Sequence, residues 1–253
     1  MIGVFDSGVG GLSVLTRIRA RLPAADLLYV ADRARAPYGR RSLDEVRGFS
    51  EVITDRLLAE GAGLVVVACN TASAAALHHL RARHPAVPFV GMEPAVKPAA
   101  ALSGRGVVGV LATAATFQGE LFASVVDRYA SGVVVVAEAC TGWVELVERG
   151  TVAGPEAEAA VRSHLRPVLD AGADTLVLGC THYPFLAPVI RAVAGDKVTV
   201  VDPSDAVARR VVEVSGAAAE GEGRLRVVTT APTSGLDALV EHLTGLRVRS
   251  ERW

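Results

Sequence analysis

One stretch of this chain occurs twice, and the repetition limits the folds that the chain can adopt. Residues 61–69 read GAGLVVVAC and residues 172–180 read GADTLVLGC, so the two align without gaps at an offset of 111 positions. Each copy has the pattern of a helix end, a short buried strand and then a cysteine. A weaker repeat pairs residues 2–7 with residues 108–113, and both end on a hydroxyl side chain. We therefore expect two copies of one structural unit.

Short apolar runs bounded by glycine alternate with longer segments in which apolar residues recur at three- and four-residue spacing. That alternation is typical of parallel sheets covered by helices. Strands are expected at Ile2–Phe5, Leu27–Val30, Leu64–Ala68, Phe89–Gly91, Val107–Leu111, Val133–Ala137, Thr175–Leu178, Thr199–Val201 and Leu225–Thr229. Helices are expected at Leu12–Arg21, Leu43–Glu60, Ala72–Arg83, Gln118–Tyr129, Glu156–Asp170, Leu186–Val193 and Asp205–Val214, and a loose surface loop at Ala217–Gly223. The predicted fold is α/β: two similar doubly wound domains, related by a pseudo-two-fold axis, with the active site in the cleft between them.

The composition is that of an ordinary enzyme or ligand-binding protein. The chain has 253 residues, enough for two small domains, and 51% of them are apolar while 21% are charged. A formal net charge of −1 gives neither the basic excess of a nucleic-acid binder nor a disordered composition. The N-terminal residues lack a signal-peptide pattern, and no apolar run approaches the roughly 18 residues of a membrane span. A cytoplasmic location, without membrane or direct nucleic-acid contact, is expected.

The chain has three cysteines, Cys69, Cys140 and Cys180, spaced too far apart for a C-x-x-C metal motif. In a reducing compartment they are also poor candidates for a disulfide framework. Cys140 has no polar signature around it and is expected to be a small core residue. A metal site built from Cys69, Cys180 and His182 is conceivable, but such sites usually bring closely spaced ligand pairs, so no metal is predicted.

Cys69 and Cys180 each follow a predicted strand, and ligands of open α/β sheets bind at the carboxyl ends of strands. A lone cysteine in such a place is usually a core residue, but the repeat makes these two equivalent. Polar residues follow both of them, at 70–73 and 181–183, where side chains and backbone N–H groups could hold a carboxylate. A thiol on each wall of one cleft can remove the α-hydrogen of an amino acid on one face and return a proton on the other. The sequence therefore predicts a racemase that needs no cofactor.

Each thiol needs a neighbour that tunes it, because a free thiol with a pKa of about 8.5 is mostly protonated at neutral pH. His182 lies two residues after Cys180, and Asp6 ends the first predicted strand, which should lie near the strand before Cys69. Asp6 could instead only cap its loop. The glycine-rich run at residues 8–11 lacks the Lys-Ser/Thr of a phosphate-binding loop, so a tight turn near the substrate is expected there.

At these residues the sequence resembles the glutamate racemases, cofactor-independent enzymes that supply D-glutamate for bacterial peptidoglycan and so for the cell wall and cell shape. The resemblance extends over nearly the whole chain. It is carried by residues 3–12 (GVFDSGVGGL), 37–39 (PYG), 68–73 (ACNTAS), 93–95 (EPA), 111–113 (LAT) with Thr116, 147–148 (VE) and 178–184 (LGCTHYP).

The resemblance implies roles for individual residues. Cys69 and Cys180 would be the two acid/base residues, assisted by Asp6, His182 and Glu148. Glu148 could also be only a solvated charge near a helix end. The residues that would contact substrate are Asp6, Ser7, Tyr38, Gly39, Asn70, Thr71, Thr113, Thr116, Thr181 and His182.

The resemblance also implies a domain arrangement and a homodimer. One domain would comprise residues 1–94 and 207–253, with Cys69, and the other residues 95–206, with Cys180. The sequence departs from the family pattern in two places. Cys140 is followed by Thr141 where proline is usual, and Arg33 stands where threonine is common.

Two other functions stay open at this point. The substrate could be aspartate or another acidic amino acid, because the sequence does not measure the depth of the cleft. The protein could also be a catalytically inert regulator of a partner such as DNA gyrase. Retention of both thiols argues against an inert cleft.

Overall fold

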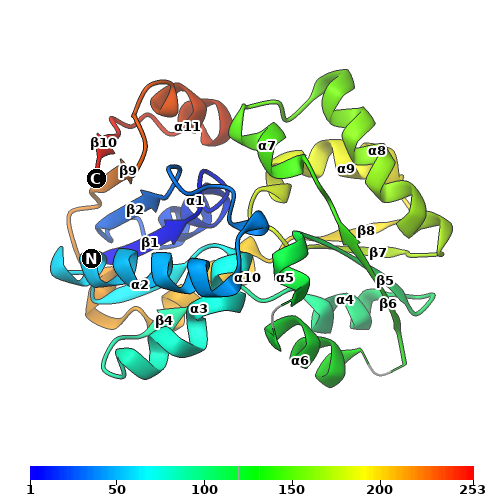
Figure 1. Cartoon of the computed structure of the whole chain (residues 1–253), viewed down its shortest axis with the longest axis horizontal. Coiled ribbons are helices and arrows are strands. Elements are labelled where there is room, and N and C mark those ends of the chain that lie inside the picture. The colour runs from blue at the N-terminus through cyan, green and yellow to red at the C-terminus, as the bar shows by residue number, and fades with distance from the viewer. Residues whose placement is uncertain (119, 131) are drawn as a thin grey trace.

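The computed structural model describes residues 1–118, 120–130 and 132–253, and within these ranges the chain forms two β-sheets flanked by helices (Figure 1). One sheet has six strands in the order β10-β9-β2-β1-β3-β4, and the other has four in the order β6-β5-β7-β8. Every pairing within them is parallel. The predicted α/β class with parallel sheets is confirmed.

The strands are β1 (Ile2–Asp6), β2 (Leu27–Ala31), β3 (Leu64–Val67), β4 (Phe89–Val90), β5 (Val107–Ala112), β6 (Val134–Ala139), β7 (Thr175–Leu178), β8 (Thr199–Val201), β9 (Leu225–Thr229) and β10 (Glu251–Arg252). The α-helices are α1 (Leu12–Arg21), α2 (Leu43–Ala59), α3 (Asn70–Arg83), α4 (Val96–Leu102), α5 (Ala114–Gln118), α6 (Glu120–Tyr129), α7 (Trp143–Glu148), α8 (Gly154–Asp170), α9 (Ala187–Ala194), α10 (Ser204–Val214) and α11 (Leu236–Thr244). Short 3-10 turns are η1 (Tyr38–Arg40), η2 (Tyr183–Leu186) and η3 (Gly216–Ala219).

The two sheets repeat one connectivity. Strand β1 lies between β2 and β3, with β4 beyond β3, and β5 lies between β6 and β7, with β8 beyond β7. The repeated sequence falls on β3 and β7, which are therefore equivalent strands. Strands β9 and β10 come from the end of the chain and extend only the first sheet. The duplication expected from the sequence is confirmed in the strand order.

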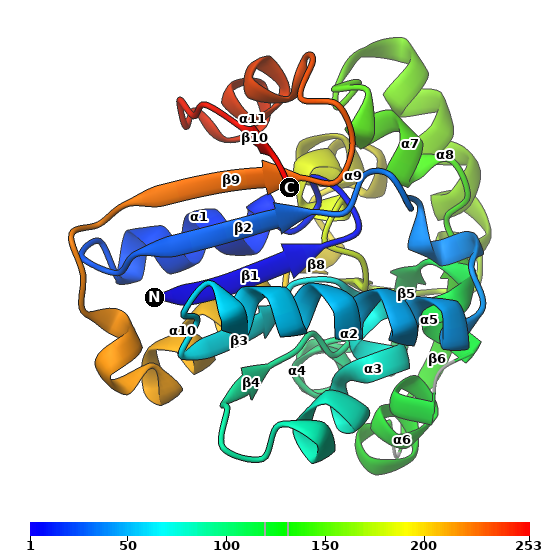
Figure 2. The same cartoon turned by 60° about the vertical axis from the view of Figure 1, so that its left-hand side comes forward.

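Side chains of β1 alternate between the two faces of the first sheet, as a strand requires. Ile2 and Val4 pack with Ile18 of α1, whereas Phe5 packs on the opposite face with Leu57 of α2. Figure 2 shows α1 behind these strands and α2 in front of them. Because both faces are covered, the strand is apolar throughout until it reaches Asp6, at the edge where the functional site lies.

The second sheet is covered in the same way. Leu176 and Leu178 of β7 pack with Leu165 of α8, while Val177 points to the other face and packs with Ala99 of α4. Helices therefore cover both faces of β7 up to its end at Leu178, two residues before Cys180.

Several short elements were not predicted, namely α4, α5, α7, α11, β10 and the three 3-10 turns. Helix α11 shows the reason: it is only nine residues long, and its limits are set by left-handed glycines, Gly235 (φ 75°) and Gly245 (φ 73°). Such glycines can be recognised as helix ends only when the helix itself is known. The predicted loop at 217–223 is wrong in part, because η3 occupies its first residues. In the predicted helix Gln118–Tyr129, Gly119 lies outside the described residues.

The expected return of the chain to the first domain falls inside a helix. The boundary between residues 206 and 207 lies within α10, which packs against α1 beside the first sheet. We propose that the chain crosses between the domains at Asp202 and Pro203 instead, just before α10 begins.

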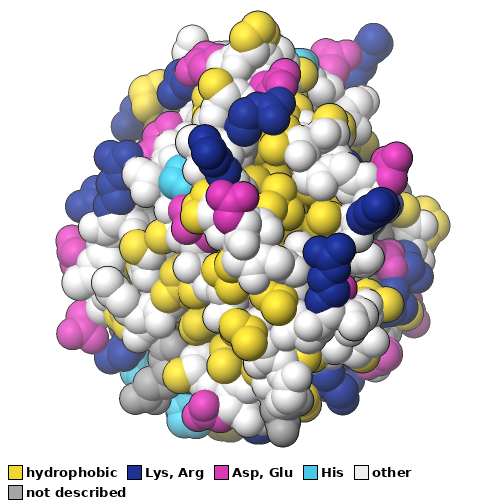
Figure 3. Space-filling view, turned by 90° about the vertical axis from the view of Figure 1, so that its right-hand side faces the viewer, with side chains coloured by type: hydrophobic (Ala, Val, Ile, Leu, Met, Phe, Trp, Pro, Cys, Tyr) yellow, Lys and Arg dark blue, Asp and Glu magenta, His cyan; other side chains and the backbone are white. Residues whose placement is uncertain are grey.

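The end of the molecule formed by the second sheet carries charges of both signs. Figure 3 shows apolar side chains gathered across the middle of this face, with Lys, Arg, Asp and Glu mostly around them. Neither sign predominates there, as a formal net charge of −1 suggests. None of the described helices is both long enough and apolar enough to cross a membrane.

Candidate active site

Cys69 lies between the end of β3 and the start of α3. Its backbone is extended (φ −143°, ψ 123°), and its Sγ accepts a hydrogen bond from the Ala72 N–H at 3.5 Å, in the position of a helix N-cap. The side chain is buried. Burial raises the pKa of the Cys69 thiol, and the negative charge of Asp6 raises it further, while the Ala72 N–H opposes both. This thiol therefore holds its proton in the closed structure.

Cys180 follows β7 and begins a row of three interacting side chains. Its Sγ lies 3.7 Å from Nδ1 of His182, and Nε2 of His182 lies 2.8 Å from Oε1 of Glu148. A carboxylate can only accept, so Nε2 carries the hydrogen of that bond. Nδ1 is then the ring atom that faces the sulfur.

The charges along this row support one another. Burial disfavours the His182 imidazolium, but its hydrogen bonds to Cys180 and Glu148 outweigh that cost, and the pKa of His182 is raised well above its ordinary value. Burial also opposes ionisation of Glu148. The hydrogen bond from His182 prevails there, and the pKa of Glu148 is lowered. The row is thus built to hold an imidazolium between a carboxylate and the sulfur.

Asp6 connects the two domains. Its Oδ1 accepts hydrogen bonds from the Gly8 N–H at 2.7 Å and from the Ser7 hydroxyl at 3.3 Å, and its Oδ2 accepts one from the Thr181 hydroxyl at 2.8 Å. Burial raises the pKa of Asp6, opposed by the nearby charge of His182. Asp6 was expected beside Cys69 alone, but it also accepts a hydrogen bond from Thr181, the neighbour of Cys180.

Three threonine hydroxyls meet where the domains face each other. Thr71 of α3 lies 3.0 Å from Thr113 and 3.4 Å from Thr116, and the last two are 2.9 Å apart. Gly39 closes over them, since a Cβ there would lie 2.9 Å from the Cβ of Thr113. The hydroxyl of Tyr38 is turned away and donates to Asp32.

Asn70 is 3% exposed, and neither its amide nitrogen nor its amide oxygen has a hydrogen-bond partner among the described residues. An unpaired buried amide costs about 1–3 kcal/mol, so such a group in a native protein calls for an explanation, such as a catalytic role or a bound water or ion. Asn70 directly follows Cys69 and begins α3. Its free donor and acceptor therefore mark a place for a polar substrate beside the first thiol.

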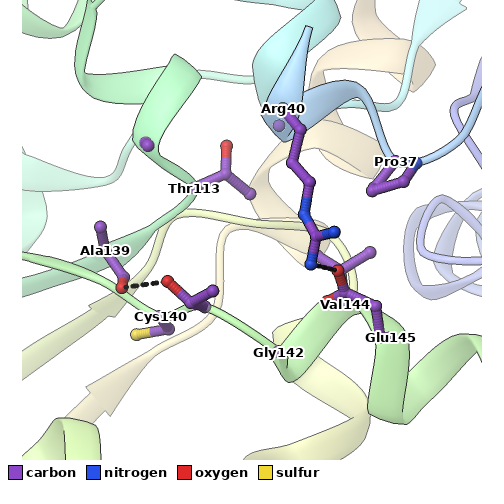
Figure 4. Close-up of a pocket in the computed structure, with 11 residues that line it drawn as sticks. Pro37, Arg40, Thr113, Ala139, Cys140, Gly142, Val144 and Glu145 are labelled. Carbon is purple, nitrogen blue, oxygen red and sulfur yellow. Dashed lines mark hydrogen bonds and ion pairs between the residues drawn. The ribbon is translucent and has the colours of Figure 1, made fainter.

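Two cavities lie between the segment at residues 33–40 and helix α7. One of about 100 Å³ is lined by Gly39, Arg40, Thr113 and Cys140, among others, and Figure 4 shows Arg40 reaching across it to Glu145. The other, about 530 Å³, is lined by Arg33 and Glu148, among others. Cys69 and Cys180 line neither cavity and are 5% and 7% exposed. Both thiols are therefore buried away from the walls of these two cavities.

The site residues expected from the sequence lie at the end of β1 and on the loops and helices that follow β1, β2, β3, β5, β6 and β7. Sequence reasoning did not find the ion pairs of Arg33 with Glu148 and of Arg40 with Glu145, which join the two domains. Nor did it find the hydrogen bond from Ser13 to the backbone oxygen of Thr181. Within residues 1–118, 120–130 and 132–253, no group of three or more His, Cys, Asp or Glu side chains is placed to hold a metal.

Comparison with known proteins agrees with this arrangement. The family model described as Asp/Glu/Hydantoin racemase matches residues 2–211. A glutamate racemase of Roseiflexus sp. (strain RS-1) is 54% identical over 229 residues, which cover 90% of this chain and 83% of that protein. The structure of Escherichia coli glutamate racemase with L-glutamate and the activator UDP-MurNAc-Ala has a TM-score of 0.87 and 33% identity, covering 99% of this chain and 96% of the other. The Francisella tularensis enzyme with D-glutamate also has a TM-score of 0.87, with 26% identity and 100% and 96% covered. The chain therefore belongs to the Asp/Glu/Hydantoin racemase family.

Proposed function

We propose that this racemase interconverts L- and D-glutamate by a two-thiol proton transfer that uses no cofactor. The observation that carries the proposal is the placement of the two thiols. Cys69 and Cys180 follow the equivalent strands β3 and β7, and they lie near enough for a negative charge on Cys180 to raise the pKa of Cys69. The likeness to glutamate racemases along most of the chain supports glutamate as the substrate.

The surroundings of the two thiols differ. Cys69 is buried and holds its proton, whereas the sulfur of Cys180 lies 3.7 Å from the His182 ring. The Cys180 thiolate would remove the α-hydrogen from one face of the amino acid. Cys69 would then deliver a proton to the opposite face, which inverts the centre. In the reverse direction the two residues exchange roles.

The electrostatics of the site would lower the rest of the barrier. A positioned acid or base typically contributes about 10² to 10⁴-fold, so the developing carbanion must be stabilised as well. The N–H groups at the start of α3 and the Asn70 amide are donors suited to the α-carboxylate, where negative charge accumulates during the reaction. Asp6, held by three hydrogen bonds, would orient Ser7 and Thr181 on either side of the substrate.

The hydroxyl cluster of Thr71, Thr113 and Thr116 is suited to a second carboxylate. Its members come from both domains, so a carboxylate bound there would also hold the domains together. Gly39 covers the cluster. Tyr38, the remaining proposed substrate contact, lies in the same 3-10 turn and would hold Gly39 against the substrate.

D-glutamate made in this way would serve peptidoglycan synthesis in the cytoplasm. We propose that the working form of the enzyme is a homodimer.

The substrate proposal predicts a clear preference between two acidic amino acids. Purified protein, without pyridoxal phosphate or added metal, is expected to bring the circular dichroism of L-glutamate to zero. We expect kcat/KM for L-aspartate to be lower than that for L-glutamate by at least about tenfold, since one methylene in a fitted site is worth roughly 10 to 200-fold. Equal rates would contradict the assignment to glutamate. Loss of signal only with added cofactor would contradict the mechanism, and no turnover of either amino acid would favour an inert regulator.

A further inference from the structure

We propose that Arg33 is a positioning residue that holds the Glu148 carboxylate in place behind His182, and thereby maintains the charge state of the Cys180–His182–Glu148 row. This inference rests on the proposed two-thiol function.

The geometry at Glu148 leaves a defined place for Arg33. Oε1 of Glu148 already accepts two hydrogen bonds, from His182 Nε2 at 2.8 Å and from the Val9 N–H at 2.7 Å. Nε of Arg33 lies 3.4 Å from the other oxygen, Oε2. The two side chains are 23% and 18% exposed, so the pair is partly shielded from water. Arg33 thus fixes the side of the carboxylate that His182 does not reach.

The charged and titratable groups around Glu148 explain why a cation beside this carboxylate matters. Asp6 of β1 places a second carboxylate near His182, and the charge of Glu148 opposes ionisation of Asp6. Tyr29 of β2 also faces this group and stays neutral. On α7 itself, Glu145 pairs with Arg40, and the adjacent Arg149 pairs with Glu156.

Apart from His182, Arg33 is therefore the cation paired with Glu148 among the described residues. Without it, Glu148 would take up a proton at a higher pH, since an opposite charge close by favours the ionised carboxylate. The His182 imidazolium beside Cys180 would then lose its counter-ion.

The chain offers a matched control on the same two elements. Arg40 and Glu145 also form an ion pair from the segment after β2 to α7, one helical turn before Glu148. Among the interactions of the described residues, Glu145 forms its ion pair with Arg40 and no hydrogen bond or ion pair with His182. Breaking the Arg40–Glu145 pair would loosen the same contact between the domains while leaving the row untouched. Any effect specific to Arg33 therefore reports on Glu148 rather than on closure of the cleft.

The test compares the pH dependence of glutamate racemisation in Arg33→Gln, Arg33→Lys and Arg40→Gln. We expect Arg33→Gln to match wild type near pH 7 and to lose up to about fivefold in kcat/KM as the pH falls through about 5 to 4, because Glu148 without a partly buried ion pair worth about 1 kcal/mol takes up its proton earlier in that range. Arg33→Lys keeps the charge and should recover most of the loss. Arg40→Gln should show the pH dependence of wild type. A profile of Arg33→Gln that runs parallel to wild type at all pH values would overturn the inference.

A double variant separates this role from attraction of the anionic substrate by Arg33. In a Glu148→Gln background, adding Arg33→Gln should cause no further pH-dependent loss, because the ion pair is already absent. A persisting fivefold effect in that background would show that Arg33 acts elsewhere.

A titration of the His182 ring nitrogens by NMR requires no turnover. The ring signals should shift when Glu148 takes up its proton, and this shift should come at higher pH in Arg33→Gln than in wild type, while Arg40→Gln matches wild type. Identical titrations in all three proteins would reject the role of Arg33, whereas failure of the proposed function would appear as absent racemisation by the wild type.

Discussion

Cys69→Ser and Cys180→Ser are each expected to lose glutamate racemisation, by at least about 10² to 10⁴-fold, the range that a positioned acid or base contributes. A hydroxyl is a far weaker acid than a thiol, so serine cannot supply the thiolate or replace it after proton transfer. In either variant one thiol remains on one face of the cleft. Exchange of the α-hydrogen with solvent deuterium should therefore persist for one enantiomer, and the favoured enantiomer should differ between the two variants.

Cys140→Ser is the matched control for this pair. Cys140 is also buried, but its sulfur contacts the backbone oxygen of Glu138 and takes no part in the row with His182. A serine hydroxyl can donate to the same oxygen, so we expect activity within a few-fold of wild type. Full racemase activity in Cys69→Ser or in Cys180→Ser would contradict the two-thiol mechanism.

Gly10→Ala is expected to reduce kcat by about a hundredfold or more, because displacements of about 1 Å in an active site can have effects of that size. A Cβ at Gly10 would lie 2.2 Å from Nδ1 of His182 and 2.7 Å from the hydroxyl oxygen of Thr181. Both groups would have to move, and Nδ1 is the atom that faces Cys180. Steady-state kinetics and the melting temperature of the variant should show a loss of activity greater than the loss of stability explains.

Gly48→Ala is the control for this substitution. Gly48 is exposed within α2, and a Cβ there would meet no atom within 4 Å. Alanine should stabilise the protein by about 0.5–1 kcal/mol and leave turnover unchanged. Activity of Gly10→Ala equal to that of Gly48→Ala would show that His182 is not held as the structure has it.

Gly10 also illustrates what the sequence can and cannot predict. Its place in a glycine-rich run after a strand predicts a tight turn, and the chain does turn there, between β1 and α1. The reason for glycine is different: His182, far along the chain and from the other sheet, packs against it. That contact depends on how the two domains meet, which no local pattern records.

The same distinction holds for the rest of the site. Cys69 and Cys180 could be paired from the sequence because the repeat is local, with a strand and a cysteine in each copy. The strands followed from their apolar runs for the same reason. The hydrogen bond from Thr181 to Asp6 and the ion pair of Arg33 with Glu148 join segments on different domains. Their residue types were visible, but their partners were set only by the packing of the domains.

The most direct test of the two-thiol mechanism is the fate of the α-hydrogen when L-glutamate is racemised in D₂O. Because one thiol removes the hydrogen and the other delivers a deuteron, D-glutamate formed early should carry one deuterium at the α-carbon, while the remaining L-glutamate stays protiated. Deuterium entering L-glutamate as fast as D-glutamate, or D-glutamate that retains the original hydrogen, would indicate a single base and contradict the roles given to Cys69 and Cys180.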